Sequence, residues 1–380
     1  MKIFFHPFPC LNTPSGKASR RLAQVLLCNG RIATNGGKMK LTALKLALLS
    51  TLALGSNALA ADKIIYGEDD RVDYYAMPES FRWAADSTVS LWKKKSMLPD
   101  LAAGKYTLGA FNLGQAYNLC PGTRFADQDA GANCSGALVG EDLILTAGHC
   151  IVTESDCRGT AFVFGFAAKT EGQPAPASVP SGEVYTCAKI IKRQLLNTTT
   201  EVDNVETTVF GGDYALIKLD RPVKNHKPLA INRGGGLKKG DGLFVTGHPL
   251  GLPFKFTPGG MVVKNVDPQA AFFSTNLDTF GGNSGSPVFN AATGLIEGVH
   301  VRGEGQHFVP TFEGCTTYLV RPPGTGSGGH VTKIDFLAAD IPPTAQENAA
   351  AKYRDVSAKE IKNRAVSAEL PSPESVRFDF

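Results

Sequence analysis

The chain has 380 residues, of which 43 % are hydrophobic and 19 % charged, with 41 Gly and 23 Pro. This composition can fill a folded core and is too rich in Gly for a helical bundle. The net charge of +4 is uneven, because the first 60 residues carry eight Lys and Arg and no acid, which leaves −4 on the remainder. A mildly acidic remainder excludes the basic surface that a nucleic-acid partner would need.

The N-terminal segment predicts export. A positive stretch at 39–45 precedes an apolar run at 46–55, and residues 57–60 end in the small-x-small pattern of signal-peptidase sites. The apolar run has about half the length of a spanning helix. We therefore expect residues 39–60 to be a removed signal peptide that leaves no stable membrane anchor, and the product to be secreted or periplasmic. Residues 1–38 show no apolar period, and we expect an upstream extension that is disordered or not translated.

Short apolar runs separated by Gly, Pro, Asn and Asp clusters dominate the chain after the signal segment. They lie at 135–139, 143–146, 161–166, 214–219, 243–246, 260–264 and 295–301. Regular short strands with such turn signals are typical of β-barrels. We therefore expect an all-β protein with one domain at 61–340, divided near 221–239, and a polar tail at 341–380.

Three motifs hold residues suited to nucleophilic catalysis. In chain order, His149 lies in LTAGHC, Asp213 in GDYALIKL and Ser284 in FGGNSGSPV. A serine hydroxyl is a poor nucleophile on its own, so it needs a base and a group that orients the base. The order His, Asp, Ser excludes the α/β-hydrolase arrangement, in which Ser comes first.

Each residue type predicts a role. His149 would take the proton of Ser284 as general base, and Asp213 would hold the imidazole tautomer. The glycines before Ser284 would let the backbone N–H groups of Gly282 and Ser284 form an oxyanion hole. The chemistry passes through an acyl-enzyme that water hydrolyses. It needs no cofactor, and no metal-ligand spacing appears in the sequence.

The three motifs resemble those of the chymotrypsin-like serine endopeptidases, over roughly residues 64–340. The resemblance implies two six-stranded antiparallel β-barrels, at about 64–225 and 235–330, with the active site in the cleft between them. It also implies a short C-terminal helix, which we place at 331–340. The function implied is a secreted, monomeric endopeptidase that acts on protein or peptide substrates. An inactive homologue that binds a partner through the same cleft is the alternative, and the complete triad argues against it.

Six of the eight cysteines follow the signal segment, which indicates an oxidising compartment. The expected pairs are Cys134–Cys150, Cys157–Cys187 and Cys120–Cys315. The first is implied by the resemblance, because its spacing is that of the family's histidine-loop disulfide. The second brackets two predicted neighbouring strands, and the third is left by elimination. Six cysteines allow 15 connectivities, so the residues alone leave the pairing open.

Within this family the chain is most similar to the bacterial glutamyl endopeptidases. Residues 64–71 look like the mature start of those enzymes, and 281–290 match their nucleophile loop. Asn283 stands where pancreatic-type proteases carry the Asp that pairs with the new N-terminus on activation. The resemblance implies that the amine of Ile64, released by cleavage after Lys63, lies near the substrate pocket instead.

The sequence holds two conflicting specificity signatures. Thr279 and His300 stand where glutamyl endopeptidases hold a substrate carboxylate, whereas Asp278 stands where trypsin places an anionic pocket floor. A semi-buried carboxylate attracts Arg or Lys and repels Glu. We expect cleavage after basic residues, because one anion at the floor suffices. The alternative is Glu or Asp specificity, with Asp278 turned away or paired with His300. Arg302, at the pocket mouth, could neutralise Asp278 or contact substrate. The other histidines (His226, His248, His307 and His330) are expected at the surface.

Overall fold

The structure is a computed structural model that describes residues 64–202, 205–303, 307–345 and 347, without the side chains of 197–210. The predicted extension, the predicted signal peptide and nearly all of the predicted tail lie outside the described residues. Among the helices that are described, none is long and apolar enough to cross a membrane.

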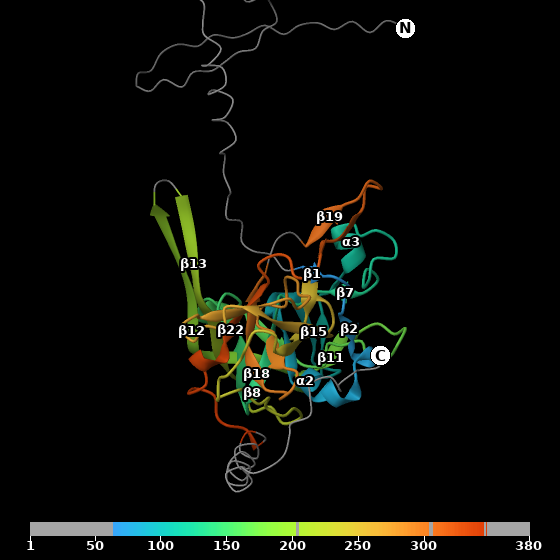
Figure 1. The fold of residues 1–380 in the computed structure, drawn as a ribbon. Coiled ribbons are helices and arrows are strands. Elements are labelled where there is room, and N and C mark those ends of the chain that lie inside the picture. Colours follow the sequence, from blue (N-terminus) through green and yellow to red (C-terminus); the bar gives the residue numbers. More distant parts are fainter. Residues whose placement is uncertain (1–63, 203–204, 304–306, 346, 348–380) are drawn as a thin grey trace, which may run out of the picture. The chain divides into compact units, whose positions relative to one another are not determined.

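The first barrel is a closed sheet of six antiparallel strands in the order β10-β12-β13-β9-β8-β3. Its long paired strands β12 and β13 lie side by side in Figure 1. Its strands are β3 (Thr88–Lys93), β8 (Cys134–Gly140), β9 (Leu143–Thr146), β10 (Thr160–Val163), β12 (Val184–Val202) and β13 (Val205–Leu219). Pairing of β10 with both β3 and β12 closes the ring.

The second barrel has the order β14-β17-β18-β22-β16-β15, and pairing of β15 with β14 closes it. Its strands are β14 (Gly242–Gly247), β15 (Lys255–Lys264), β16 (Phe272–Thr275), β17 (Pro287–Asn290), β18 (Ile296–Arg302) and β22 (Gly329–Lys333). A short strand, β2 (Val72–Asp73), adds to the outer side of β15. The predicted all-β fold of two six-stranded antiparallel barrels is therefore confirmed.

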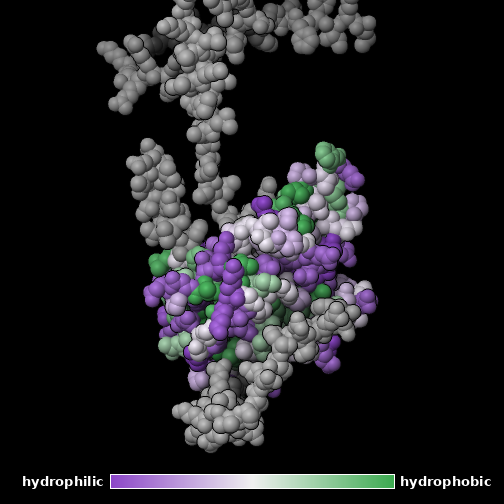
Figure 2. Space-filling model, viewed as in Figure 1, coloured by the Kyte–Doolittle hydropathy of each residue, from purple (hydrophilic) through white to green (hydrophobic). Residues whose placement is uncertain are grey.

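The remaining elements are short and lie outside the barrels. The strands are β1 (Ile65–Tyr66), β4 (Met97–Asp100), β5 (Lys105–Leu108), β6 (Phe111–Asn112), β7 (Asp129–Ala130), β11 (Ser178–Pro180), β19 (Phe308–Pro310), β20 (Thr316–Tyr318) and β21 (Val320–Arg321). The α-helices are α2 (Arg82–Asp86), α3 (Leu113–Tyr117) and α4 (Glu154–Arg158). The hairpin of β19 and β20 carries Phe312, fully exposed, at its tip, and Figure 2 shows apolar surface there.

Strands at the barrel interface are apolar on both faces, which explains their nearly continuous hydrophobic runs. Successive side chains of a strand point to opposite faces. In β8, Leu138 therefore packs inside the first barrel, and its neighbours Ala137 and Val139 pack in a second cluster that includes Phe244 of the other barrel. The two barrels thus share one apolar cluster at their interface.

The expected C-terminal helix is present only as a 3-10 helix of three residues, Ile334–Phe336. The predicted helix at 331–340 was wrong in its first part, because Val331 belongs to β22 and pairs with Phe273 inside the second barrel. Ile334, Leu337 and Ile341 are buried in the cluster that joins the barrels. Burial in a sheet and at the interface overrides the helical pattern of this segment.

All three expected disulfides are present: Cys134–Cys150, Cys157–Cys187 and Cys120–Cys315. The third closes a loop across 195 residues and ties the β19–β20 hairpin to the segment that follows α3. The first joins β8 to the turn after β9, where His149 lies. The Cys134–Cys150 bond therefore fastens the turn that carries His149 to the first barrel.

Candidate active site

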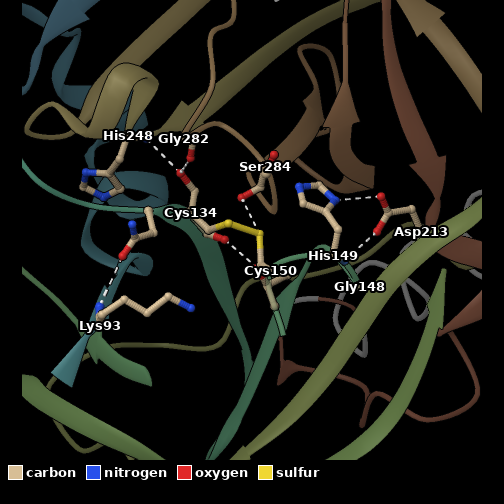
Figure 3. Close-up of a disulfide and its surroundings, with 12 residues drawn as sticks. Lys93, Cys134, Gly148, His149, Cys150, Asp213, His248, Gly282 and Ser284 are labelled. Atoms are coloured by element: carbon tan, nitrogen blue, oxygen red, sulfur yellow. Dashed lines mark hydrogen bonds and ion pairs between the residues drawn. A yellow bond between two sulfur atoms is a disulfide. The ribbon is translucent and has the colours of Figure 1, made fainter. Parts of the chain in front are cut away.

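The three residues predicted as a triad come together from both barrels. His149 follows β9, Asp213 lies in β13 and Ser284 precedes β17. The Nδ1 atom of His149 lies 2.8 Å from Oδ2 of Asp213, and the backbone N–H of His149 donates to Oδ1 at 3.1 Å. Figure 3 shows Ser284 on the side of the imidazole ring that faces away from Asp213. The second ring nitrogen of His149 is therefore on the same side of the ring as Ser284 in Figure 3.

Burial and neighbouring charges together determine the pKa of Asp213. The side chain of Asp213 is 2 % exposed, whereas that of His149 is 36 % exposed. Burial acts to raise the pKa of Asp213, but the hydrogen bonds and charge of His149, together with the charge of Arg302, outweigh burial and lower that pKa. Asp213 is therefore a buried carboxylate that stays ionised.

Ser135 of β8 fastens the nucleophile loop to the first barrel. Its backbone N–H donates to the carbonyl of Ser284 at 2.8 Å, and its hydroxyl donates to the carbonyl of Gly282 at 2.8 Å. The same hydroxyl accepts from the backbone N–H of His248 at 2.9 Å. Ser135 was not predicted as a site residue; its only sequence signal is its place next to Cys134, which the disulfide joins to the neighbour of His149 (Figure 3).

Arg302 is a second residue of the site whose partner the sequence did not predict. Its Nη2 donates to Oδ2 of Asp213 at 3.3 Å. The sequence led us to expect Arg302 beside Asp278 or substrate, but the structure places its guanidinium on the triad carboxylate instead. Burial lowers the pKa of Arg302, and Asp213 opposes that shift.

Asp278 is buried beside the segment that follows Ile64. The residue is 3 % exposed, and its two oxygens accept from the backbone N–H groups of Tyr66 at 2.7 Å and Asp70 at 3.0 Å. Contact with a basic substrate side chain stays a prediction, because a carboxylate has about four acceptor sites and these donors use two of them. Asp278 thus holds the segment that follows Ile64.

The structure places Thr279 next to Ile64. The backbone N–H of Thr279 donates to the carbonyl of Ile64 at 3.3 Å, and both residues are buried. His300 is buried in β18, with its backbone bonded to Ser286 and Gly285 of the nucleophile loop. All three residues thus lie beside the loop that carries Ser284.

The segment after Ile64 is anchored by a buried arginine. Arg71 is fully buried, and its guanidinium lies over the rings of Phe280 at 4.3 Å and Tyr318 at 4.5 Å, while Asp69 pairs with it at 2.7 Å. Such cation–π contacts are strongest where the cation is desolvated. Phe280 directly precedes the nucleophile loop. Arg71 therefore links residues 64–71 to that loop.

All four histidines expected at the surface are buried or half-buried: His248 is buried, and His226, His307 and His330 are half-buried. Burial lowers the pKa of His248 to about 3. Burial, with Arg302 and Lys264 as further causes, lowers the pKa of His330 to about 4. His307 contacts the nucleophile loop, where its Nε2 accepts from the backbone N–H of Gly281 at 3.3 Å. The sequence did not predict this contact.

Asp278 predicts a pH dependence of stability. Burial, the largest cause, raises its pKa to about 7, although the hydrogen bonds from Tyr66 and Asp70 act to lower it. An unfolded Asp titrates near 3.9, as a rough reference value. Between these values the folded state binds more protons than the unfolded state, so this group makes stability fall as pH rises from about 4 to about 7.

In Asp278→Asn this part of the pH dependence is expected to disappear. Thermal unfolding of both proteins between pH 4 and 8 measures it. Glu68→Gln, a substitution in the same segment, serves as control. An unchanged slope in Asp278→Asn would contradict the assignment.

Residues 134–299 match the model of the Trypsin-like peptidase domain family. A curated relative, Secreted RxLR effector protein 73 of Plasmopara viticola, is 26 % identical over 178 residues, which are 44 % of this chain and 40 % of that protein. The chain thus spans about two fifths of the length of that relative.

Solved structures of two proteases are also similar. A Glu endopeptidase in complex with MPD has 15 % identity and a TM-score of 0.37, with 77 % of this chain and 100 % of that chain covered. The VesB protease of Vibrio cholerae has 14 % identity and a TM-score of 0.39, with 73 % and 66 % covered. The chain thus combines two β-barrels with a region, residues 134–299, that is similar to the trypsin-like peptidase domain.

Proposed function

We propose that this peptidase is a serine endopeptidase that works through His149, Asp213 and Ser284. The observation that carries the proposal is the 2.8 Å contact between Nδ1 of His149 and Asp213, with Ser284 on the other side of the ring (Figure 3). In this geometry His149 accepts the Ser284 proton as the hydroxyl attacks a peptide carbonyl, and later returns it to the leaving amine. Water then hydrolyses the acyl-enzyme.

Two carbonyl orientations support the proposed oxyanion hole. The carbonyl of Gly281 accepts from the N–H of Leu250 at 2.5 Å, and the carbonyl of Asn283 accepts from the N–H of Ser286 at 2.9 Å. In a trans peptide the C=O and the next N–H point in opposite directions. The N–H groups of Gly282 and Ser284 therefore point away from these partners, as donors to a substrate oxyanion must.

The proposal includes export and a monomeric enzyme. Three disulfides within the described residues fit an oxidising compartment, so the site of action is secreted or periplasmic. All three triad residues come from one chain, so a second copy is not needed to build the site. Protein or peptide substrates follow from the peptidase family. A binding module without activity is disfavoured, because such a module has no need for the aligned pair of His149 and Asp213.

For specificity we propose cleavage after acidic residues. Asp278, the carboxylate that would have selected Arg or Lys, is held by the backbone of Tyr66 and Asp70. The basic residue that remains beside the nucleophile loop is His300 of β18, whose backbone is bonded to Ser286 and Gly285. A desolvated basic pocket attracts a carboxylate and repels an ammonium. The proximity of Ile64 to Thr279 supports a contribution from the Ile64 amine once it is released.

Cleavage of a fluorogenic peptide library, varied at the residue before the scissile bond, tests this specificity. The matured enzyme starting at Ile64 is expected to prefer Glu over Lys by more than about 100-fold, a difference that a buried charge contact can supply. Asp278→Ser is expected to keep this preference, whereas His300→Gln should reduce it. A preference for Arg or Lys that is lost in Asp278→Ser would refute acidic specificity and restore Asp278 as the pocket floor.

A further inference from the structure

Asp213 Oδ2 accepts from two cation-forming groups at once. His149 Nδ1 lies 2.8 Å from this oxygen, and Arg302 Nη2 lies 3.3 Å from it. The triad mechanism requires only the first contact. The second places a permanent positive charge within about 6 Å of the base, at a distance where two like charges still interact in a partly buried site.

Neighbouring contacts fix the carboxylate and the guanidinium. The backbone N–H of Asp213 donates to Thr332 Oγ1 at 3.1 Å, which ties β13 to β22 of the other barrel. Arg302 ends β18, its side chain is 11 % exposed, and in the sheet it pairs with His330 of β22. The contact between Arg302 and Asp213 is therefore held in place by strands of both barrels.

We propose that Arg302 is a positioning residue that sets the pH range of the reaction: its charge, held on Asp213, keeps His149 neutral at lower pH. The inference rests on the proposed triad. When His149 takes the proton from Ser284 it becomes a cation, and the guanidinium on the shared oxygen disfavours that form. The enzyme thereby keeps a competent base in mildly acidic surroundings.

Other basic residues lie near the triad, and their contacts distinguish them from Arg302. Those on the elements packed against it are Lys192 and Arg193 of β12, Lys264 of β15 and His330 of β22. Arg193 donates to the carbonyl of Gly148 at 2.8 Å, and Lys192 pairs with Asp340 at 2.7 Å. Arg302 differs from these groups in that its side chain donates directly to Asp213.

The experiment is the pH profile of kcat/KM for wild type, Arg302→Gln and Arg302→Lys. Gln can keep the hydrogen bond to Asp213 without the charge, and Lys keeps the charge. The acid limb of Arg302→Gln is expected to move to higher pH by about one unit, because the repulsion is removed. Arg302→Lys should stay within about 0.3 unit of wild type. Arg221→Gln, which removes a cation paired with Asp220 in the first barrel, should not move the limb.

The position of the limb does not depend on how much enzyme is active, so a partly folded variant still gives a valid reading. The pH dependence of labelling of Ser284 by a fluorophosphonate supplies the same limb without substrate. An unmoved limb in Arg302→Gln, or equal shifts in the Gln and Lys variants, would overturn the role of Arg302. Absence of labelling in wild type would instead overturn the proposed triad, so the two failures are distinct.

Discussion

Asp213→Asn is expected to lower kcat by about 10⁴-fold while the fold is kept, as for a triad whose base loses its orienting carboxylate. Oδ2 of Asp213 accepts from Nδ1 of His149, and Oδ1 accepts from its backbone N–H. An amide of the same shape would offer an N–H to one of these donors. The imidazole would then turn or change tautomer, and its other nitrogen could no longer accept the proton of Ser284.

Single-turnover and steady-state rates on one peptide substrate would measure this loss, with circular dichroism as the test of folding. Asp142→Asn is the matched control, since Asp142 is a carboxylate of the first barrel that pairs with Lys218 at 2.6 Å on the surface. It should retain full activity. A loss below about 10-fold in Asp213→Asn would mean that this carboxylate does not orient the base.

Gly282→Ala is the second substitution with a large expected effect. Gly282 has a φ of +92°, and a Cβ there would lie 2.3 Å from the carbonyl oxygen of His248 and 2.9 Å from the backbone nitrogen of Gly251. Both are backbone atoms, so a side-chain rotation cannot relieve the clash. The loop must shift, which displaces an oxyanion donor and costs about 10²–10³-fold in kcat.

The comparison for this variant is Gly172→Ala. Gly172 has a φ of +70° but no atom within 4 Å of an added Cβ. It therefore carries the conformational cost of a positive φ, about 1–2 kcal/mol, without the clash. Activity and unfolding midpoints of the two variants separate these effects. Equal losses of activity in the two variants would show that the clash at Gly282 does not affect catalysis.

The sequence could predict those parts of the molecule that depend on short local patterns of residues. Apolar runs such as 135–139 and 214–219 gave the strands, because strands at the barrel interface are buried on both faces. The three catalytic motifs could be found because each holds a distinctive residue type in a distinctive run. The pairing of the cysteines needed the family resemblance as well, since their spacing alone allows many connectivities.

The parts that the sequence did not predict depend on contacts between distant segments. Asp278 meets the backbone of Tyr66 and Asp70 across more than 200 residues. Arg302 reaches Asp213 across 89 residues. A charged residue in a loop has no local signal that tells which partner it meets, and its side chain can turn toward either of two nearby groups. The sequence alone therefore allows both basic and acidic specificity.

The most direct measurement of the central proposal is covalent labelling of the matured protein by a fluorophosphonate, followed by peptide mass mapping. We expect one adduct, on Ser284, that is absent in Ser284→Ala and much slower to form in His149→Ala. No adduct on a folded wild-type protein, or an adduct that persists in Ser284→Ala, would contradict the assignment of Ser284 as the nucleophile.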